Sequence, residues 1–140
     1  MASNPTPVAS SGSPFLIVLG RIFFAAIFIL AGSRHFMSQT IAYAASQGVP
    51  MASILVPFSG ALAVLGGLSI LLGYRAKIGA WLIVLFLVCI TPKMHAFWAV
   101  TDPMMYQMQL AHFMKNVSML GAALWITQWG SGPLSLDRRG

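Results

Sequence analysis

The chain contains no glutamate, and its only acidic residues are Asp102 and Asp137. Charged residues make up 7% of its 140 residues, whereas hydrophobic residues make up 58%. A soluble domain needs roughly 25% charged residues to keep its surface hydrated. This composition therefore excludes an ordinary water-soluble globule and predicts a single domain whose main partner is the lipid bilayer.

Cysteine is also scarce, with Cys89 as the only one. A single cysteine excludes an intrachain disulfide, a CxxC redox pair and a cysteine-rich metal site. The simplest interpretation of Cys89 is a small apolar residue in a packed helix. The sequence shows no catalytic nucleophile motif, phosphate-binding loop or paired carboxylates, so it does not indicate an enzyme that acts on its own.

The net charge of +6 comes from eight basic residues, which lie scattered at the ends of apolar segments. A nucleic-acid partner would need a basic face or stripe, and none is present in the sequence. More basic residues flank the YRAK turn and the C-terminus than flank the other loops, where Arg34 and Lys93 lie. Because positive charge favours the cytoplasmic side, we expect both termini and the YRAK turn in the cytoplasm.

Four apolar segments of roughly 19–24 residues account for most of the chain, and a helix of about 20 residues crosses the hydrocarbon core of a bilayer. The alternation typical of barrel strands is absent. The sequence therefore predicts an all-α membrane protein, an antiparallel bundle of four transmembrane helices. The expected regions are a flexible tail over 1–14, a transmembrane domain over 15–130 with spans at about 15–33, 54–73, 78–97 and 106–129, and a short basic tail over 131–140.

The connections differ in length. The first loop is long and mildly amphipathic, and Gly48 and Pro50 punctuate it, so we expect a short interfacial helix there. In the third loop, the Asp102–Pro103 pair favours a turn.

Small residues recur along two of the expected spans. Ser59, Ala63 and Gly67 follow one another every four residues on the second span, and Ser118 and Ala122 do so on the fourth. Small side chains let helix backbones approach closely in lipid. The pattern predicts helix packing within the bundle, with a homodimer interface as the alternative.

The fourth expected span carries unusual polarity. His112, Lys115, Asn116 and Met119 follow i, i+3, i+4, i+7 spacing and share one helix face. With the topology above, all three histidines of the chain fall in the outer half of the bundle. Since a charge facing lipid costs roughly 2.5–3.5 kcal/mol, we expect a polar pocket there.

Several uses of this pocket remain open. A quinone headgroup could be bound by His112, Lys115 or Asn116. Haem, copper or another metal could be held by imidazoles and a thioether. A purely structural role is the third alternative, in which Lys115 snorkels to the interface and Asn116 links two helices. The predicted ligand-binding residues are His95, His112, Lys115, Asn116, Trp98 and Tyr106, and the metal ligands, if a metal is bound, are His95, His112 and Met108.

Arg21 is the other ionisable residue within an apolar segment. Its position near the start of the first span suggests that it snorkels to the interface or marks anionic lipid headgroups.

Four segments carry a resemblance to a known family. They are GRIFFAAIFILAGSRHF in the first span, GVP before the second, LGGLSILLGYRAKIGA through the basic turn, and FMKNVSMLGAAL in the fourth span. Taken in order, they resemble the DoxX family of small four-helix bacterial membrane proteins. Relatives often carry an acidic residue ahead of the double glycine, where this chain reads SGALAVLGG, so Lys115 or Arg21 would lack that partner.

The resemblance implies a multi-pass protein of the bacterial inner membrane with both termini in the cytoplasm. Some members of the family are membrane subunits of sulfur- or quinone-linked oxidoreductase assemblies. For this chain, the resemblance therefore implies a membrane subunit or anchor of a redox assembly, bound to a protein partner or to copies of itself.

Overall fold

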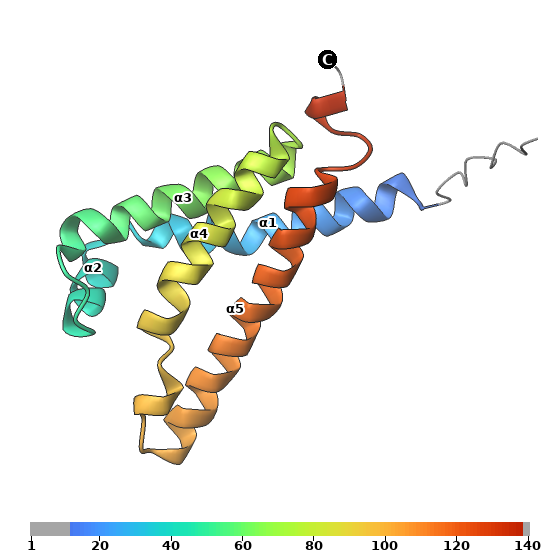
Figure 1. Cartoon of the computed structure of the whole chain (residues 1–140). Helices are drawn as coiled ribbons and strands as arrows, with labels where there is room; N and C mark the ends of the chain where they lie inside the picture. Colours follow the sequence, from blue (N-terminus) through green and yellow to red (C-terminus); the bar gives the residue numbers. More distant parts are fainter. Residues whose placement is uncertain (1–11, 139–140) are drawn as a thin grey trace, which may run out of the picture.

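The computed structural model describes residues 12–138, and in this part of the chain all regular secondary structure is helical, with no β-strand (Figure 1). The all-α class is thus confirmed. Most of the predicted N-terminal tail and the last two residues lie outside the described range. The elements are α1 (Pro14–Arg34), α2 (Ser38–Ser46), α3 (Ala52–Leu72), α4 (Ala76–Met94), η1 (Phe97–Ala99), α5 (Pro103–Trp129) and η2 (Leu136–Arg138).

Three helical segments in residues 12–138 are long and apolar enough to cross a membrane, namely Pro14–Arg34, Ala52–Leu72 and Ala76–Ala99. Helix α5 is not among them, although its 27 residues correspond to about 40 Å at 1.5 Å per residue. Its sequence includes glutamines together with His112, Lys115 and Asn116, and these polar side chains lower its hydropathy.

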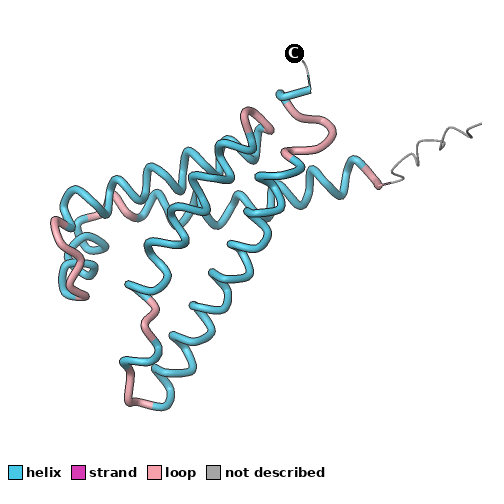
Figure 2. Tube along the Cα trace, viewed as in Figure 1, coloured by secondary structure: helices cyan, strands magenta, loops and turns pink. Residues whose placement is uncertain are grey.

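The long helices are arranged in chain order. Helix α1 packs against α3, α3 against α4, and α4 against α5, while the short α2 packs on α3. The α4–α5 hairpin is inclined to the α1–α3 pair. As a result, α2 and η1 lie at two separate ends of the molecule (Figure 2). This inclination separates polar residues that the sequence pattern alone grouped at one end of the bundle.

Glycines on two sides of α3 allow its close packing. A Cβ at Gly60 would lie 2.7 Å from the carbonyl oxygen of Gly32 in α1, and one at Gly66 would lie 2.8 Å from that of Gly79 in α4. Real Cβ atoms do not approach this closely, so these glycines set the separation of the helix backbones. On α5, by contrast, Ser118 is exposed and a Cβ at Gly121 would meet open space.

The core lies between α1, α3 and α4, and α5 contributes to it mainly through Ala123. Large apolar side chains remain exposed on every long helix, including Phe23, Leu65, Trp81 and Trp125. Lipid is the solvent that such a surface requires, since water would oppose their exposure.

The C-terminal segment folds back on the turn between α3 and α4. The backbone nitrogen of Asp137 donates to the Gly73 carbonyl at 2.8 Å. Arg21, which is 8% exposed, donates to the Leu134 carbonyl at 2.8 Å and to that of Ser131 at 3.4 Å. The expectation that Arg21 reaches lipid headgroups is therefore wrong: its partners are backbone carbonyls more than one hundred residues later in the chain.

Candidate functional site

Two of the predicted site residues meet at the far end of the α4–α5 hairpin. The rings of His95, at the end of α4, and His112, in α5, stack with centroids 5.2 Å apart and an interplanar angle of 26°. His95 Nδ1 lies 2.8 Å from the amide oxygen of Gln109, which can only accept, so Nδ1 carries a hydrogen. This bond fixes both the tautomer and the orientation of the His95 ring.

Lys115 extends the same pair along α5. Its Nζ lies 3.4 Å from His112 Nδ1, and because an ammonium only donates, that imidazole nitrogen accepts. The Lys115 side chain is otherwise exposed on α5. The imidazole thus provides the ammonium with one local polar contact.

Asn116 lies on the inner side of α5 and is 7% exposed. Its amide nitrogen donates to the Thr91 hydroxyl of α4 at 3.1 Å. The side chain therefore bridges the two helices.

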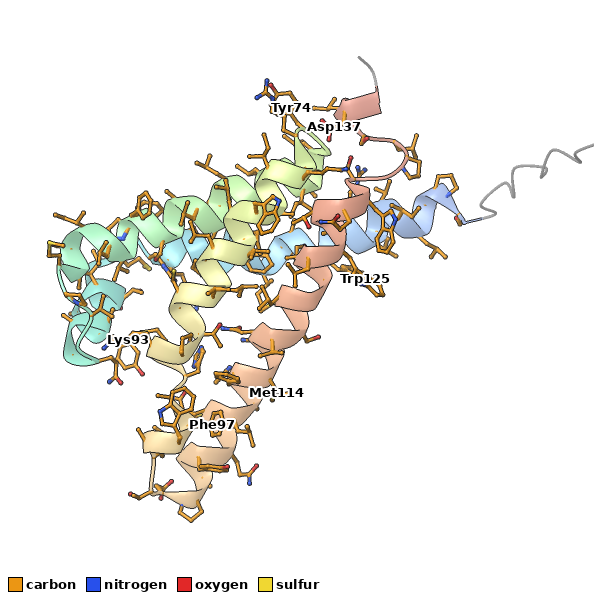
Figure 3. All side chains as sticks on the ribbon, in the orientation of Figure 1. Tyr74, Lys93, Phe97, Met114, Trp125 and Asp137 are labelled. Carbon is orange, nitrogen blue, oxygen red and sulfur yellow. The ribbon has the colours of Figure 1, made fainter. Side chains whose placement is uncertain are left out.

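An aromatic cluster closes the end of the hairpin around Phe97 (Figure 3). The Phe97 ring makes edge contacts with Trp98, Tyr106 and Phe113, at centroid distances of 5.2, 5.7 and 5.3 Å. Trp98 and Tyr106, two of the predicted ligand-binding residues, therefore both contact the Phe97 ring. Through this shared contact they connect η1 to the first turns of α5.

Metal-binding capacity in the described residues is limited. In residues 12–138, no group of three His, Cys, Asp or Glu side chains is close enough together to hold a metal ion. A metal at this end of the α4–α5 hairpin would therefore have the two imidazoles of His95 and His112 as its nitrogen ligands. Met108, one turn before His112 on α5 and half-exposed, is the thioether on the same helix face.

A cavity of about 340 Å³ lies on the other side of α4, between α4 and the α2–α3 pair. This volume is within the range of small-molecule sites, which are mostly apolar with a few placed polar groups. Most of the wall is apolar and comes from α3 and α4. The polar residues that line it are His35, Thr40, Ser59, Cys89 and Lys93.

His35 and Ser59 form the polar corner of this cavity. The Ser59 hydroxyl donates to the Val56 carbonyl at 2.7 Å, and His35 Nδ1 lies 2.8 Å from the same hydroxyl oxygen. Since the serine hydrogen is already used, His35 Nδ1 donates and Nε2 is left as an acceptor. Burial lowers the pKa of His35, which follows the last residue of α1, so the ring is neutral at pH 7.

Lys93 and Cys89 lie one helical turn apart on α4 and line the same cavity. Lys93 reaches toward the α2–α3 loop, because a Cβ at Gly48 would lie 3.5 Å from its Nζ. Cys89 is exposed rather than packed inside the core.

The polar residues that the sequence predicts to lie at one end of the bundle therefore fall into two groups separated by α4. His95, His112 and Lys115 lie with the α4–α5 hairpin, whereas His35 and Lys93 line the cavity. Sequence reasoning placed all of them at one end, but it assigned Ser59 to helix packing and did not place it at a binding site. The sequence feature that could have indicated this site is the hydroxyl of Ser59, which lies on the small-residue face of α3, where that helix packs on α1 beside His35.

Three apolar helices long enough to cross a bilayer, each with exposed apolar side chains, define a multi-pass membrane protein. Residues 16–96, more than half of the chain, match the model of the DoxX family, and the chain belongs to this family. One relative is the inner membrane protein YphA of Escherichia coli (strain K12), which is 31% identical over 128 residues, covering 90% of this chain and 91% of that protein. No solved structure matches the chain.

Proposed function

We propose that this protein is the membrane-embedded subunit or anchor of a redox assembly in the bacterial inner membrane, and that it binds a quinone-like ligand. The observation that carries the proposal is the cavity of about 340 Å³ beside α4, whose wall is mostly apolar and carries the polar side chains of His35 and Lys93. Membership of the DoxX family and the likeness to an inner membrane protein support the location.

The chemistry of the cavity suits a ligand with a neutral polar head and an apolar body. Lys93 offers only hydrogen-bond donors, which match a quinone carbonyl, whereas Nε2 of the neutral His35 offers an acceptor, which matches a quinol hydroxyl. Both redox forms of one ligand would thus find a partner. Apolar side chains such as Leu62 and Phe86 would surround the ring and its tail.

Binding is tested on the purified chain in detergent with a short-chain ubiquinone, following quenching of tryptophan fluorescence. Lys93→Met and His35→Phe are each expected to weaken binding about tenfold, since each removes one polar contact to the ligand. Lys115→Met and His112→Phe test the ligand-binding residues that the sequence predicts, which lie on the other side of α4. Loss of binding in those two variants alone would assign the quinone site to the His95–His112 group. Absence of binding to the wild type would overturn the proposal.

The proposal includes α5 as a fourth transmembrane span and both termini in the cytoplasm. Its length of 27 residues and the basic residues Arg75 and Lys77 at the α3–α4 turn support this topology. Alkaline phosphatase and fluorescent-protein fusions after residues 74, 100 and 140 distinguish the alternatives. Phosphatase activity is expected only for the fusion at residue 100, and activity at residue 140 would mean that α5 does not cross the membrane.

A protein partner is supported by the exposed flank of α5. Among the described elements, α5 packs mainly on α4 and η1, and Lys115 is exposed near the middle of the helix. A charge at that depth costs roughly 2.5–3.5 kcal/mol in lipid, which a covering subunit would relieve. Purification from native membranes in mild detergent should recover an oxidoreductase subunit, and recovery of the chain alone would contradict the assembly.

A second candidate function rests on the stacked His95–His112 pair. Gln109 orients His95 in the way that outer hydrogen bonds orient metal-binding imidazoles. The site would take copper, with Met108 as the thioether, or haem. Metal analysis and an absorption spectrum decide: copper or haem lost in both His95→Ala and His112→Ala supports this candidate, and a colourless, metal-free protein excludes it.

A further inference from the structure

We infer that a basic cleft at the α3–α4 turn binds the phosphate group of an anionic phospholipid. The cleft has a volume of about 620 Å³ and lies at the opposite end of α4 from the quinone cavity. Three parts of the chain form it: the turn before α4, the first turn of α4, and the segment that follows α5. The lining residues that bear on binding are Arg75, Lys77, Ile78, Trp129, Ser131 and Asp137.

Two cations line this cleft, Arg75 and Lys77. Lys77 is held across the end of α5, because a Cβ at Gly130 would lie 3.6 Å from its Cε. The stem of the lysine thus lies along the backbone of the neighbouring helix. This placement puts its ammonium group at the cleft.

Asp137 is the one acidic residue among the described residues that line the cleft, and its carboxylate is already engaged. It accepts hydrogen bonds from the backbone nitrogens of Arg75 and Ala76, at 2.6 and 3.1 Å, and from the Ser131 hydroxyl at 3.4 Å. The carboxylate therefore satisfies the start of α4. The Arg75 and Lys77 side chains, rather than the end of the helix, are the groups that would contact an anion.

The apolar part of the cleft favours a lipid over a soluble anion. Ile78 and Trp129 line it and are exposed, Trp129 by 76%. Trp129 also makes an edge contact with Trp125, at a centroid distance of 6.0 Å, one turn further into α5. Tryptophans gather at the membrane–water interface, so phosphate at the cations and acyl chains along these rings would satisfy both parts.

The test uses the full chain in a neutral detergent, titrated with dioctanoyl phosphatidylglycerol while tryptophan fluorescence is followed. Saturable binding is expected, and a juxtamembrane cation contributes about 1 kcal/mol, which is about fivefold in affinity. Lys77→Gln and Arg75→Gln should therefore each weaken binding about fivefold. Arg34→Gln, which removes one charge at the opposite end of α1, is the matched control and should bind as the wild type does.

Two further titrations separate the sources of the phosphate. Dioctanoyl phosphatidylcholine, which has the same tails and no net charge, should bind at least tenfold more weakly. Inorganic phosphate should not displace phosphatidylglycerol at equal concentration. Equal weakening by Arg34→Gln, unchanged binding in Lys77→Gln, or displacement by inorganic phosphate would overturn the inference, provided that each variant elutes as a folded species at the wild-type position in gel filtration.

Discussion

The Asp137 carboxylate lies 2.6 Å from the backbone nitrogen of Arg75, 62 residues earlier in the chain. Its second oxygen accepts from the nitrogen of Ala76, the first residue of α4. The first N–H groups of a helix have no partner within it, and here a residue from the C-terminal segment supplies one. The C-terminal segment thus caps a helix in the middle of the chain.

Asp137→Ala should destabilise the protein because these N–H groups lose their acceptor. Loss of a helix cap costs about 1 kcal/mol and up to about 2, so the free energy of unfolding should fall by that amount. The measurement is reversible unfolding in mixed micelles of dodecyl maltoside and dodecyl sulfate. Asp137→Asn retains one acceptor oxygen and should lose less, and an Asp137→Ala variant as stable as the wild type would contradict the capping role.

Arg21 of α1 also binds the C-terminal segment, by donating hydrogen bonds to the carbonyls of Ser131 and Leu134. Arg21→Met removes hydrogen bonds from a charged group, worth about 1.5–3 kcal/mol each. Relief of the buried charge offsets part of this loss, so the expected net destabilisation is about 2 kcal/mol. Hydrogen exchange of residues 131–137 should accelerate in this variant. Arg34→Met, an exposed arginine at the other end of α1, should leave that exchange unchanged.

The Asn116–Thr91 bond joins α5 to α4 within the bundle. Such bonds average about 0.6 kcal/mol in membrane proteins. A double-mutant cycle with Asn116→Leu and Thr91→Val should give a coupling free energy of that size, measured by unfolding in mixed micelles. Ser118→Ala, on the exposed side of the same helix, should show no coupling to Thr91→Val. A zero coupling between Asn116 and Thr91 would show that the bond adds nothing to stability.

Gly60→Ala should force α1 and α3 apart, since the new Cβ would lie 2.6 Å from His35 Cβ and 2.7 Å from the Gly32 carbonyl oxygen. Overpacking of this kind typically costs about 1–3 kcal/mol. The matched control is Gly121→Ala on α5, where a Cβ meets open space and alanine is the better helix former. The free energy of unfolding should fall for Gly60→Ala and stay level or rise for Gly121→Ala.

The helical elements are largely predictable because their signals are local. Runs of apolar residues mark α1, α3 and α4, and the expected short helix in the first loop is α2. The Asp102–Pro103 pair has a more specific role than the turn it predicts. Asp102 accepts a hydrogen bond from the Met105 nitrogen at 2.8 Å and so caps α5. At an N-cap, a side-chain oxygen accepts from one of the first backbone N–H groups of the helix.

Periodicity also placed Asn116 on the face of α5 that carries His112, and the antiparallel hairpin brought His112 to His95 at 5.2 Å. Those relations follow from helix geometry and a short connection. They could be predicted because residues three and four apart share a helix face.

By itself, the sequence determined that this chain is helical, that lipid is its solvent and that His112, Lys115 and Asn116 lie close together on one helix, because hydropathy and helical spacing act over a few neighbouring residues. The tertiary structure decided which side chains meet across elements that are distant in the chain. The inclination of α4–α5 to α1–α3 puts His35 and Lys93 at a cavity and His95 and His112 outside it. Likewise, the partners of Arg21 lie 110 and 113 residues away, and a contact across that separation depends on how the helices pack.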